Sequence, residues 1–594
     1  MSILKQIQES MKKNNVHYYI IPTNDYHQSE YVADFFKLRE FVSGFNGSAG
    51  TLVIEQERAG LWTDSRYFLQ AETQLPKEIT LHKLGSDESS DFPAYITENI
   101  KAGQAIGFDA KCISTSLGKH LLGIAEKKNA KILLDVYFAD ELWKERQTLP
   151  KNTAYFLNDD ITGENISSKI KYITDVMKEH KCHYTALTKL DDIAYLLNMR
   201  GTDVTYNPVF YSYVSIEFRE DFNNYTVKLY IDDEKLQEDT KKYLSKNNIQ
   251  ILPYEKIYDE IKFIKNKNML LDESALNFML YTNIDDTNSI VDILSPITSK
   301  KAVKNDTELK NAIYYHKIDA VAVIKLIHYV KTNIKKIDMS EISVSDKLEE
   351  FRRQCDKCVD LSFDTISGYK DHGAIVHYSA TEETNYKLEP KSILLLDSGA
   401  QYLGATTDIT RSISLGTPTD TEKFDFTTVL KGHLALSNAV FPENTTGSQL
   451  DTIAKEPIWR ENLNFFHGTG HGVGAFLNVH EGPMRISGAY NNVGFKRGMV
   501  VSNEPGLYRA GHHGIRIENL VYTEFDKETE FGKFLKFIDL TLVPIDLDLV
   551  DVDLLNSQEK LWLNNYHKRV FDEISPFIED KELKEFLKQQ TRQI

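Results

Sequence analysis

Five side chains in the last third of this 594-residue sequence have the chemistry of metal ligands. They are four carboxylates and one imidazole: Asp397, Asp408, His471, Glu504 and Glu518. Carboxylate oxygens suit hard divalent cations, and an imidazole nitrogen suits several transition metals. Four carboxylates nearly cancel the charge of two divalent cations, which would acidify a water between them to hydroxide. The set therefore predicts a two-metal site suited to hydrolysis.

The first two ligands lie on a predicted pair of strands. An aliphatic run, residues 392–396, ends at Asp397, and a second strand, expected over residues 406–413, carries Asp408. A short turn between two such runs favours an antiparallel pair, in which the carboxylates would face each other. Carboxylates so close repel unless cations lie between them. Either aspartate alone is more simply a turn cap or a solvent-facing residue.

The imidazole lies in a glycine-rich segment, residues 465–474, where four glycines surround His467 and His471. Glycine permits the close backbone approach and unusual φ values that a crowded site requires. A phosphate-binding loop is the alternative, but no Lys-Ser/Thr or dinucleotide pattern follows. Another histidine, His480, lies shortly downstream.

The last two ligands accompany predicted strands. Glu504 follows a short aliphatic run, and Glu518 lies in the segment 514–519. Alternation along that segment places Arg516 and Glu518 on one face of a strand. We therefore expect Arg516 to orient Glu518 and to keep it ionised.

Composition narrows the class of protein. The net charge of −17 argues against nucleic acid or an anionic membrane as partner, because both would repel the average surface. The first residues are too polar for a secretory signal, and no apolar run approaches the roughly eighteen residues of a membrane span. A cytoplasmic protein is the default expectation.

The length and the breaks in the pattern predict three domains, at residues 1–150, 151–300 and 301–594. Proline-containing segments near residues 150 and 296 suggest the boundaries. No obvious repeat is present in the sequence. The smaller expectations are a helix over 167–180, a strand over 184–187, a helix over 191–198, a long helix capped by Asn305 and Glu308, and a C-terminal helix capped by Asn556 and Glu559.

The four cysteines are too few for a disulfide scaffold. Cys355 and Cys358 form a C-x-x-C, which could be a redox motif or half a zinc site. No second C-x-x-C follows, and the polar context predicts an exposed helix on which the spacing arises by chance.

Several motifs resemble the cytosolic, three-domain type of the aminopeptidase P family. The resemblance is carried by residues 396–402, 407–411, 467–474, 478–483, 504–506 and 514–519, and toward the N-terminus by 27–31, 45–51, 62–68 and 198–201. It covers nearly the whole chain. It implies two N-terminal α/β domains, similar to the creatinase N-domain, followed by a pita-bread catalytic domain.

The resemblance also implies a role for each ligand. Asp397 would chelate one metal, Asp408 and Glu518 would bridge both, and His471 with Glu504 would complete the other. The metal in such enzymes is usually Mn²⁺.

By the same match, His377, His467 and His480 would line the substrate site and act with Glu504 in catalysis. Tyr508, Arg516 and Arg66 are further candidates for substrate binding. Arg66 and Trp62 lie in a segment that in relatives can reach the cleft of a neighbouring subunit, which suggests a homodimer. The segment 367–372 before His377 is more polar than expected of relatives and could alter the preference for the residue preceding proline.

The implied activity is that of an aminopeptidase that hydrolyses the bond before a proline at the second position and releases the N-terminal amino acid. A prolidase acting only on Xaa-Pro dipeptides is the alternative. The extra N-terminal domains argue against a methionine aminopeptidase. An inactive pita-bread domain that binds peptides is a further alternative, but all five ligand positions are filled.

Overall fold

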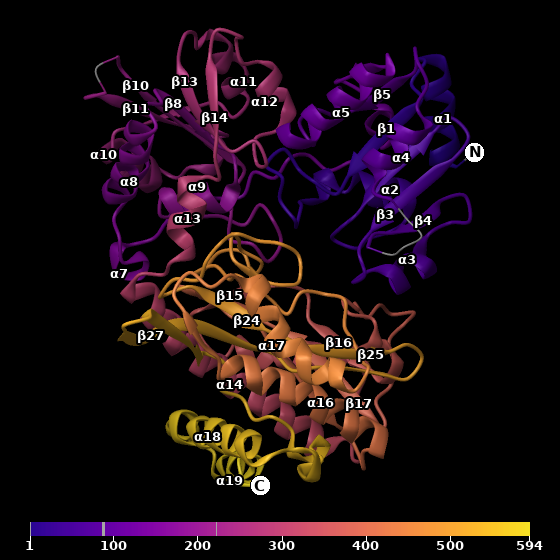
Figure 1. Cartoon of the computed structure of the whole chain (residues 1–594), viewed down its shortest axis with the longest axis vertical. Helices are drawn as coiled ribbons and strands as arrows, with labels where there is room; N and C mark the ends of the chain where they lie inside the picture. Colours follow the sequence, from indigo (N-terminus) through magenta and orange to yellow (C-terminus); the bar gives the residue numbers. More distant parts are fainter. Residues whose placement is uncertain (1, 86–89, 221) are drawn as a thin grey trace. The chain divides into compact units, whose positions relative to one another are not determined.

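The computed structural model describes residues 2–85, 90–220 and 222–594 (Figure 1). The chain divides into two compact units, residues 1–158 with 164–299, and residues 159–163 with 300–594. The boundary predicted at residue 150 falls between the two large sheets of the first unit and remains a prediction. Across the described ranges, no helix has the length and apolar character needed to cross a bilayer.

The first unit contains two mixed sheets of six strands with the same topology. In each strand order given below, the second, third and fourth strands pair antiparallel. The other neighbouring strands pair parallel. The first sheet runs β4(Thr80–Lys83)-β3(Ala59–Thr63)-β2(Thr51–Glu55)-β1(Tyr18–Pro22)-β5(Ala105–Phe108)-β6(Lys131–Leu133). The second runs β12(Ile249–Leu252)-β11(Tyr225–Ile231)-β10(Ser212–Phe218)-β8(Tyr184–Leu187)-β13(Asn268–Leu271)-β14(Ser289–Asp292). The unit is thus a structural repeat without an obvious sequence repeat.

Local predictions in this unit agree with the structure. Helix α8 spans Ile166–Glu179, strand β8 spans Tyr184–Leu187, and helix α9 spans Leu190–Leu196. Trp62, in the segment expected to approach a neighbouring subunit, does not itself point outward. It is 2% exposed, and its ring stacks on His82 with the centroids 3.9 Å apart. Trp62 is therefore a core residue.

The second unit is organised around the long helix α14, Asp306–Asn333. Asn305 and Glu308 form the predicted capping box, which satisfies backbone N–H groups of the first turn. One face of α14 packs in a large apolar core with the strands and the other helices. These helices are α15(Glu341–Arg352), α16(Asp420–Ser437), α18(Ser557–Ile574) and α19(Lys581–Gln590). Asn556 and Glu559 cap α18 as predicted, and α18 and α19 lie against α14 (Figure 1).

Short sheets and hairpins in this unit carry the candidate ligands. A three-stranded antiparallel sheet runs β16(Ile366–Tyr369)-β17(Ile393–Ser398)-β20(Ile409–Ser414), which confirms the predicted strand pair. A four-stranded sheet runs β21(Val440–Pro442)-β28(Gly532–Asp539)-β27(Asn519–Thr529)-β24(Val500–Asn503). Two further pairs are β22(Gly470–His471) with β23(Arg485–Ile486), and β25(Gly506–Arg509) with β26(His513–Arg516).

A buried ion pair connects α14 and α15 to the end of β17. The guanidinium of Arg352 donates to both carboxylate oxygens of Asp319, at 2.8 and 3.1 Å. It also donates to Ser398 Oγ at 3.1 Å and to the carbonyl of Gly399 at 3.3 Å. Tyr402 donates its hydroxyl to the same aspartate at 2.9 Å. Because Ser398 follows Asp397, this pair holds the strand end that presents a candidate ligand.

The helix predicted across Cys355 and Cys358 is wrong. Helix α15 ends at Arg352, and Cys358 begins the short strand β15, Cys358–Leu361. Cys355 closes a turn, because its carbonyl accepts from the backbone N–H of Cys358 at 3.0 Å. Both thiols are free and partly exposed.

We expect Arg352→Ala to destabilise the second unit by about 3–5 kcal/mol, because it leaves the carboxylate of Asp319 buried without its counter-charge. The thermal midpoint and a denaturant titration of the full chain would measure this loss. Arg353→Ala is the matched control, since its side chain is exposed and pairs with Glu349 on the surface. Equal effects of the two substitutions would contradict the assignment.

Candidate metal centre

Asp397 and Asp408 come from neighbouring strands of the same sheet. Asp397 lies in β17 opposite Thr410 of β20, and Asp408 immediately precedes β20. Both aspartates are buried, with 8% and 4% of their surface exposed. The predicted convergence of these two carboxylates is therefore present in the fold.

His471 is delivered by strand β22, which crosses close to β24. A side chain at Gly470 would place its Cβ 2.0 Å from the carbonyl oxygen of Ser502, so only glycine permits this approach. His471 Nδ1 donates to the carbonyl of Gly472 at 3.0 Å, which directs Nε2 toward the acidic residues. Nε2 lies 3.4 Å from both Asp408 Oδ2 and Glu504 Oε1.

Glu504 directly follows β24 and is half-buried. Its backbone N–H donates to the carbonyl of Thr469 at 2.8 Å, which ties it to the glycine-rich segment. The hydroxyl of Ser502 donates to Glu504 Oε1 at 3.0 Å and also accepts the backbone N–H of His471 at 2.9 Å. Ser502, which the sequence did not single out, therefore fixes two candidate ligands relative to each other.

Glu518 lies between β26 and β27 and is 1% exposed. Its backbone N–H donates to the carbonyl of Thr410 at 3.1 Å, and its carbonyl accepts from Arg411 Nη1 at 2.7 Å. The hydroxyl of Thr410 donates to Glu518 Oε2 at 2.7 Å. One ligand atom each from Asp408, His471 and Glu518 can be chosen within 4.8 Å of one another. These residues can therefore share one cation.

The charge of Arg516 acts on Glu518 as predicted, but its direct ion pair is with a different candidate ligand. Its Nη2 pairs with Asp397 Oδ2 at 2.5 Å, and the side-chain hydrogen bond to Glu518 comes from Thr410. Arg516 Nη1 donates to the hydroxyl of Tyr508 at 2.9 Å, and that hydroxyl lies 2.7 Å from His467 Nε2. Arg516 therefore links a candidate ligand to a candidate substrate residue.

The pKa values of the candidate ligands are shifted by burial and by their proximity to one another. Burial raises the pKa of Asp397 to about 7, although Arg516 opposes the shift. Burial and the charges of Asp408, Glu504 and Asp397 raise the pKa of Glu518 well above its ordinary value. For His471, burial acts to lower the pKa, but the hydrogen bond to Asp408 and the charges of Glu504 and Asp408 raise it to about 9. The site thus attracts positive charge.

The donor atoms of these residues fit divalent cations. Within the described residues, Asp397 Oδ1 and Asp408 Oδ1 are buried side-chain oxygens that receive no hydrogen bond. Buried polar atoms normally have a partner, and a carboxylate oxygen facing other carboxylates is satisfied by a cation. The imidazole nitrogen of His471 completes a donor set of oxygen and nitrogen that suits first-row divalent metals.

The remaining predicted residues lie in both units. The ring of His480 lies 4.4 Å from that of His471. His377 is half-buried and follows Val376, whose carbonyl accepts from Arg516 at 3.4 Å. Arg66 belongs to the other unit, where its guanidinium donates to both oxygens of Asp64 at 2.9 and 2.8 Å.

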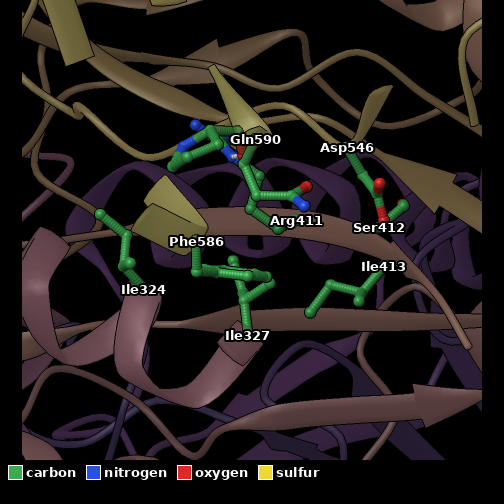
Figure 2. Close-up of a pocket in the computed structure, with 9 residues that line it drawn as sticks. Ile324, Ile327, Arg411, Ser412, Ile413, Asp546, Phe586 and Gln590 are labelled. Carbon is green, nitrogen blue, oxygen red and sulfur yellow. Dashed lines mark hydrogen bonds between the residues drawn. The ribbon is translucent and has the colours of Figure 1, made fainter. Parts of the chain in front are cut away.

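A small pocket elsewhere in the second unit is separate from this site (Figure 2). Its volume is about 10 Å³, close to the least that holds one water. Residues of α14, β20 and α19 line it, among them Ile327, Arg411 and Phe586. None of the predicted site residues contributes to its wall.

Known protein families match nearly the whole length of the chain. The pattern of metallopeptidase family M24 matches residues 313–524, and the C-terminal region of peptidase M24 matches 533–594. The creatinase/prolidase N-terminal domain matches residues 3–133 and 145–308. A probable Xaa-Pro aminopeptidase P from Talaromyces marneffei is 38% identical over 99% of this chain and 92% of its own. The chain belongs to the aminopeptidase P family. Aminopeptidase P2 of Arabidopsis thaliana is also 38% identical, over 97% of this chain and 85% of its own.

A solved structure agrees with this assignment. The X-prolyl aminopeptidase of Caenorhabditis elegans matches with a TM-score of 0.95 and 32% identity, over 100% of this chain and 99% of that one. That protein is described as a cytosolic enzyme with a di-nuclear active site. The resemblance noted in the sequence and the expected fold class are confirmed: two creatinase-type N-terminal domains precede a pita-bread metallopeptidase domain.

We expect divalent cations to bind more weakly at about pH 6 than at about pH 8. Because the pKa of Asp397 is raised to about 7, this carboxyl is largely protonated at the lower pH, and a cation must displace its proton. Titration calorimetry in buffers of different ionisation enthalpy would measure both the affinity and the protons released. Glu349→Gln, a change far down α15 on the surface, should leave both unchanged. Binding that is independent of pH and releases no protons would exclude this account.

Proposed function

We propose that this protein removes the N-terminal amino acid from peptides that have proline at the second position. The observation that carries the proposal is the convergence of Asp397, Asp408, His471, Glu504 and Glu518 in one site, where Asp397, Asp408 and Glu518 are buried. That site belongs to a chain with full-length similarity to proteins named Xaa-Pro aminopeptidases. The activity is that of a metal-dependent exopeptidase.

The chemistry of proline explains why a dedicated site is needed. A bond to proline nitrogen is a tertiary amide without an N–H, and the ring restricts approach to the carbonyl. The site must therefore hold the carbonyl carbon exposed to water and protonate the proline nitrogen as it leaves. When bound, two divalent cations would supply Lewis acidity toward the carbonyl and toward a water.

We assign the ligands as follows. Asp397 would hold one cation, His471 and Glu504 would hold the second, and Asp408 and Glu518 would contribute oxygens to both. The short distances from His471 Nε2 to Asp408 and Glu504 support this division. Arg516 orients Asp397 through Oδ2, and Oδ1, which receives no hydrogen bond, would be available to a cation.

Glu504 is the proposed proton carrier. Burial acts to raise its pKa, but the positive charges of His471 and Arg516 outweigh burial and lower the pKa below its ordinary value. Glu504 is therefore ionised at neutral pH and able to accept a proton for transfer to the leaving nitrogen. His377, His467 and His480 would contact the scissile carbonyl and the proline, and Tyr508 and Arg516 would support His467.

Three finer assignments go with the activity. Mn²⁺ is the proposed ion, because carboxylates with one imidazole suit it. A cytoplasmic location fits the described cytosolic relative and the four free cysteines. A homodimer in which Arg66 enters the partner's cleft is the proposed assembly.

A prolidase limited to Xaa-Pro dipeptides is the alternative activity. The domain boundaries near residues 150 and 300 also remain proposals.

A substrate pair separates the two activities. We expect the purified protein with Mn²⁺ to cleave an Xaa-Pro-Yaa tripeptide and to lose this activity on treatment with a chelator, because the carbonyl and water lose their Lewis acid. Chromatography of the products would show one free amino acid and a dipeptide that begins with proline. Cleavage of an Xaa-Pro dipeptide alone would select the prolidase, and a tripeptide with alanine in place of proline is the control substrate.

Complementation tests the dimer. Asp408→Asn removes a bridging ligand, and Arg66→Ala removes the proposed contribution of the partner. Co-expression of the two variants should recover about a quarter of wild-type activity, because half the dimers are mixed and each contains one complete site. Light scattering would give the mass. If Arg66 acts within its own subunit, both sites of a mixed dimer are defective, and co-expression recovers no activity.

A further inference from the structure

The segment between β16 and β17, residues 370–392, carries His377 and has little regular structure of its own. It contains one short 3₁₀ helix, Lys370–Ala374, and then turns. Backbone without a hydrogen-bonded ladder is held by other contacts or moves. What fixes this segment therefore decides where the imidazole of His377 lies.

A single buried carboxylate holds the outer side of the segment. Glu341, the first residue of α15, has 0% of its surface exposed. Its oxygens accept the backbone N–H groups of Tyr369 and Tyr386, both at 2.8 Å. They also accept His372 Nδ1 at 2.9 and 3.1 Å and the hydroxyl of Tyr378 at 3.0 Å. Three donors from the segment, and the backbone N–H of Tyr369 just before it, thus converge on one side chain.

The ring of His372 fills the space between the donors. It stacks on Tyr386 with centroids 3.6 Å apart and on Tyr378 with centroids 4.4 Å apart. Tyr378 immediately follows His377, so its hydroxyl contact with Glu341 bears directly on the backbone of the histidine. The polarity of this segment, noted in the sequence, is therefore used in part to bind Glu341.

The inner side of the same segment contacts the hairpin that carries Arg516. The backbone of Gly373 lies so close to Gly514 that a Cβ there would meet the Gly373 carbonyl oxygen at 1.6 Å. The carbonyl of Val376 accepts from Arg516 at 3.4 Å. The segment is thus held on one side by Glu341 and on the other by the hairpin, with His377 between the two attachments.

We propose that Glu341 is a positioning residue, which fixes the segment around its carboxylate and so places the imidazole of His377 against the substrate. This role rests on the proposed function. A carboxylate is required because each of its two oxygens accepts a backbone N–H, from Tyr369 at Oε1 and from Tyr386 at Oε2, and a backbone N–H can only donate. A glutamine would turn its NH₂ group toward one of these two N–H groups. The NH₂ group and the N–H that it faces would then both lack an acceptor.

Glu341→Gln tests the proposal with an Xaa-Pro-Yaa tripeptide. We expect kcat to fall by roughly 10- to 100-fold, since a displacement of about 1 Å can cost that much. The number of bound Mn²⁺ ions and their affinity, measured by titration calorimetry, should stay at wild-type values, because Glu341 touches none of the proposed ligands in its hydrogen bonds.

The decisive comparison is a double-mutant cycle with His377→Ala. If Glu341 acts through His377, Glu341→Gln has little further effect on kcat once the imidazole is gone. Effects that multiply in the double variant would overturn the proposal, as would a single variant with wild-type kcat. Tyr378→Phe, which removes one donor and keeps the carboxylate, should give a smaller fall with the same non-additivity and serves if Glu341→Gln does not fold.

Two controls separate this inference from the function beneath it. Glu350→Gln changes a carboxylate on the same helix whose partner is the surface residue Lys347, and it should retain wild-type kcat. Failure of the wild-type protein to cleave the tripeptide would refute the proposed function. A wild-type protein that cleaves it, with Glu341→Gln equally active, would refute the positioning role alone.

Discussion

Repulsion among four carboxylates held close together, three of them buried, is the constraint that governs the second unit. Like charges at short range in a poorly hydrated site are costly unless something positive lies between them. Protons and fixed cations take that place in the protein itself: the pKa values of Asp397 and Glu518 are raised, that of His471 is raised to about 9, and Arg516 pairs with Asp397. A site that retains protons in this way is one that divalent cations can occupy by displacing them.

The repulsive groups stay together because their backbones are locked, and not because their side chains attract one another. Arg411, on the face of β20 opposite Thr410, shows how these backbones are held in place. Its guanidinium donates to the carbonyls of Thr410, Glu518, Val543 and Pro544 and to side chains including Tyr566. Glycines permit the close crossings that the ligand segments need, as at Gly470 against Ser502. The apolar core behind the strands then supplies the favourable free energy that the site itself does not.

Sequence reasoning succeeded where the signal was local. The caps at Asn305 and Asn556, the strand pair around Asp397 and Asp408, and the motifs that mark the family depend on neighbours in the chain. It failed where partners are distant. The alternation that put Arg516 beside Glu518 could not show that the guanidinium reaches across to Asp397.

The same limit explains the other differences. The shared topology of the two N-terminal sheets is invisible in the sequence, because a common strand order requires only similar patterns of burial and not similar residues. Trp62 sits in a family motif, yet its indole is buried against His82. Ser502, Thr410 and Glu341 were not singled out, since each matters only through contacts with segments far along the chain.

The hydrogen bonds around His467 suit it to orient the substrate and leave proton transfer to another residue. Its Nδ1 donates to the carbonyl of Gly468 at 2.7 Å, so Nε2 of the neutral ring accepts the hydroxyl proton of Tyr508. Burial lowers the pKa of His467 to about 4, which keeps the ring neutral at physiological pH. A neutral ring with this tautomer has no proton on Nε2 to give to a leaving nitrogen. Proton transfer therefore falls to a group such as Glu504, and His467 is left to orient the substrate together with Tyr508 and Arg516.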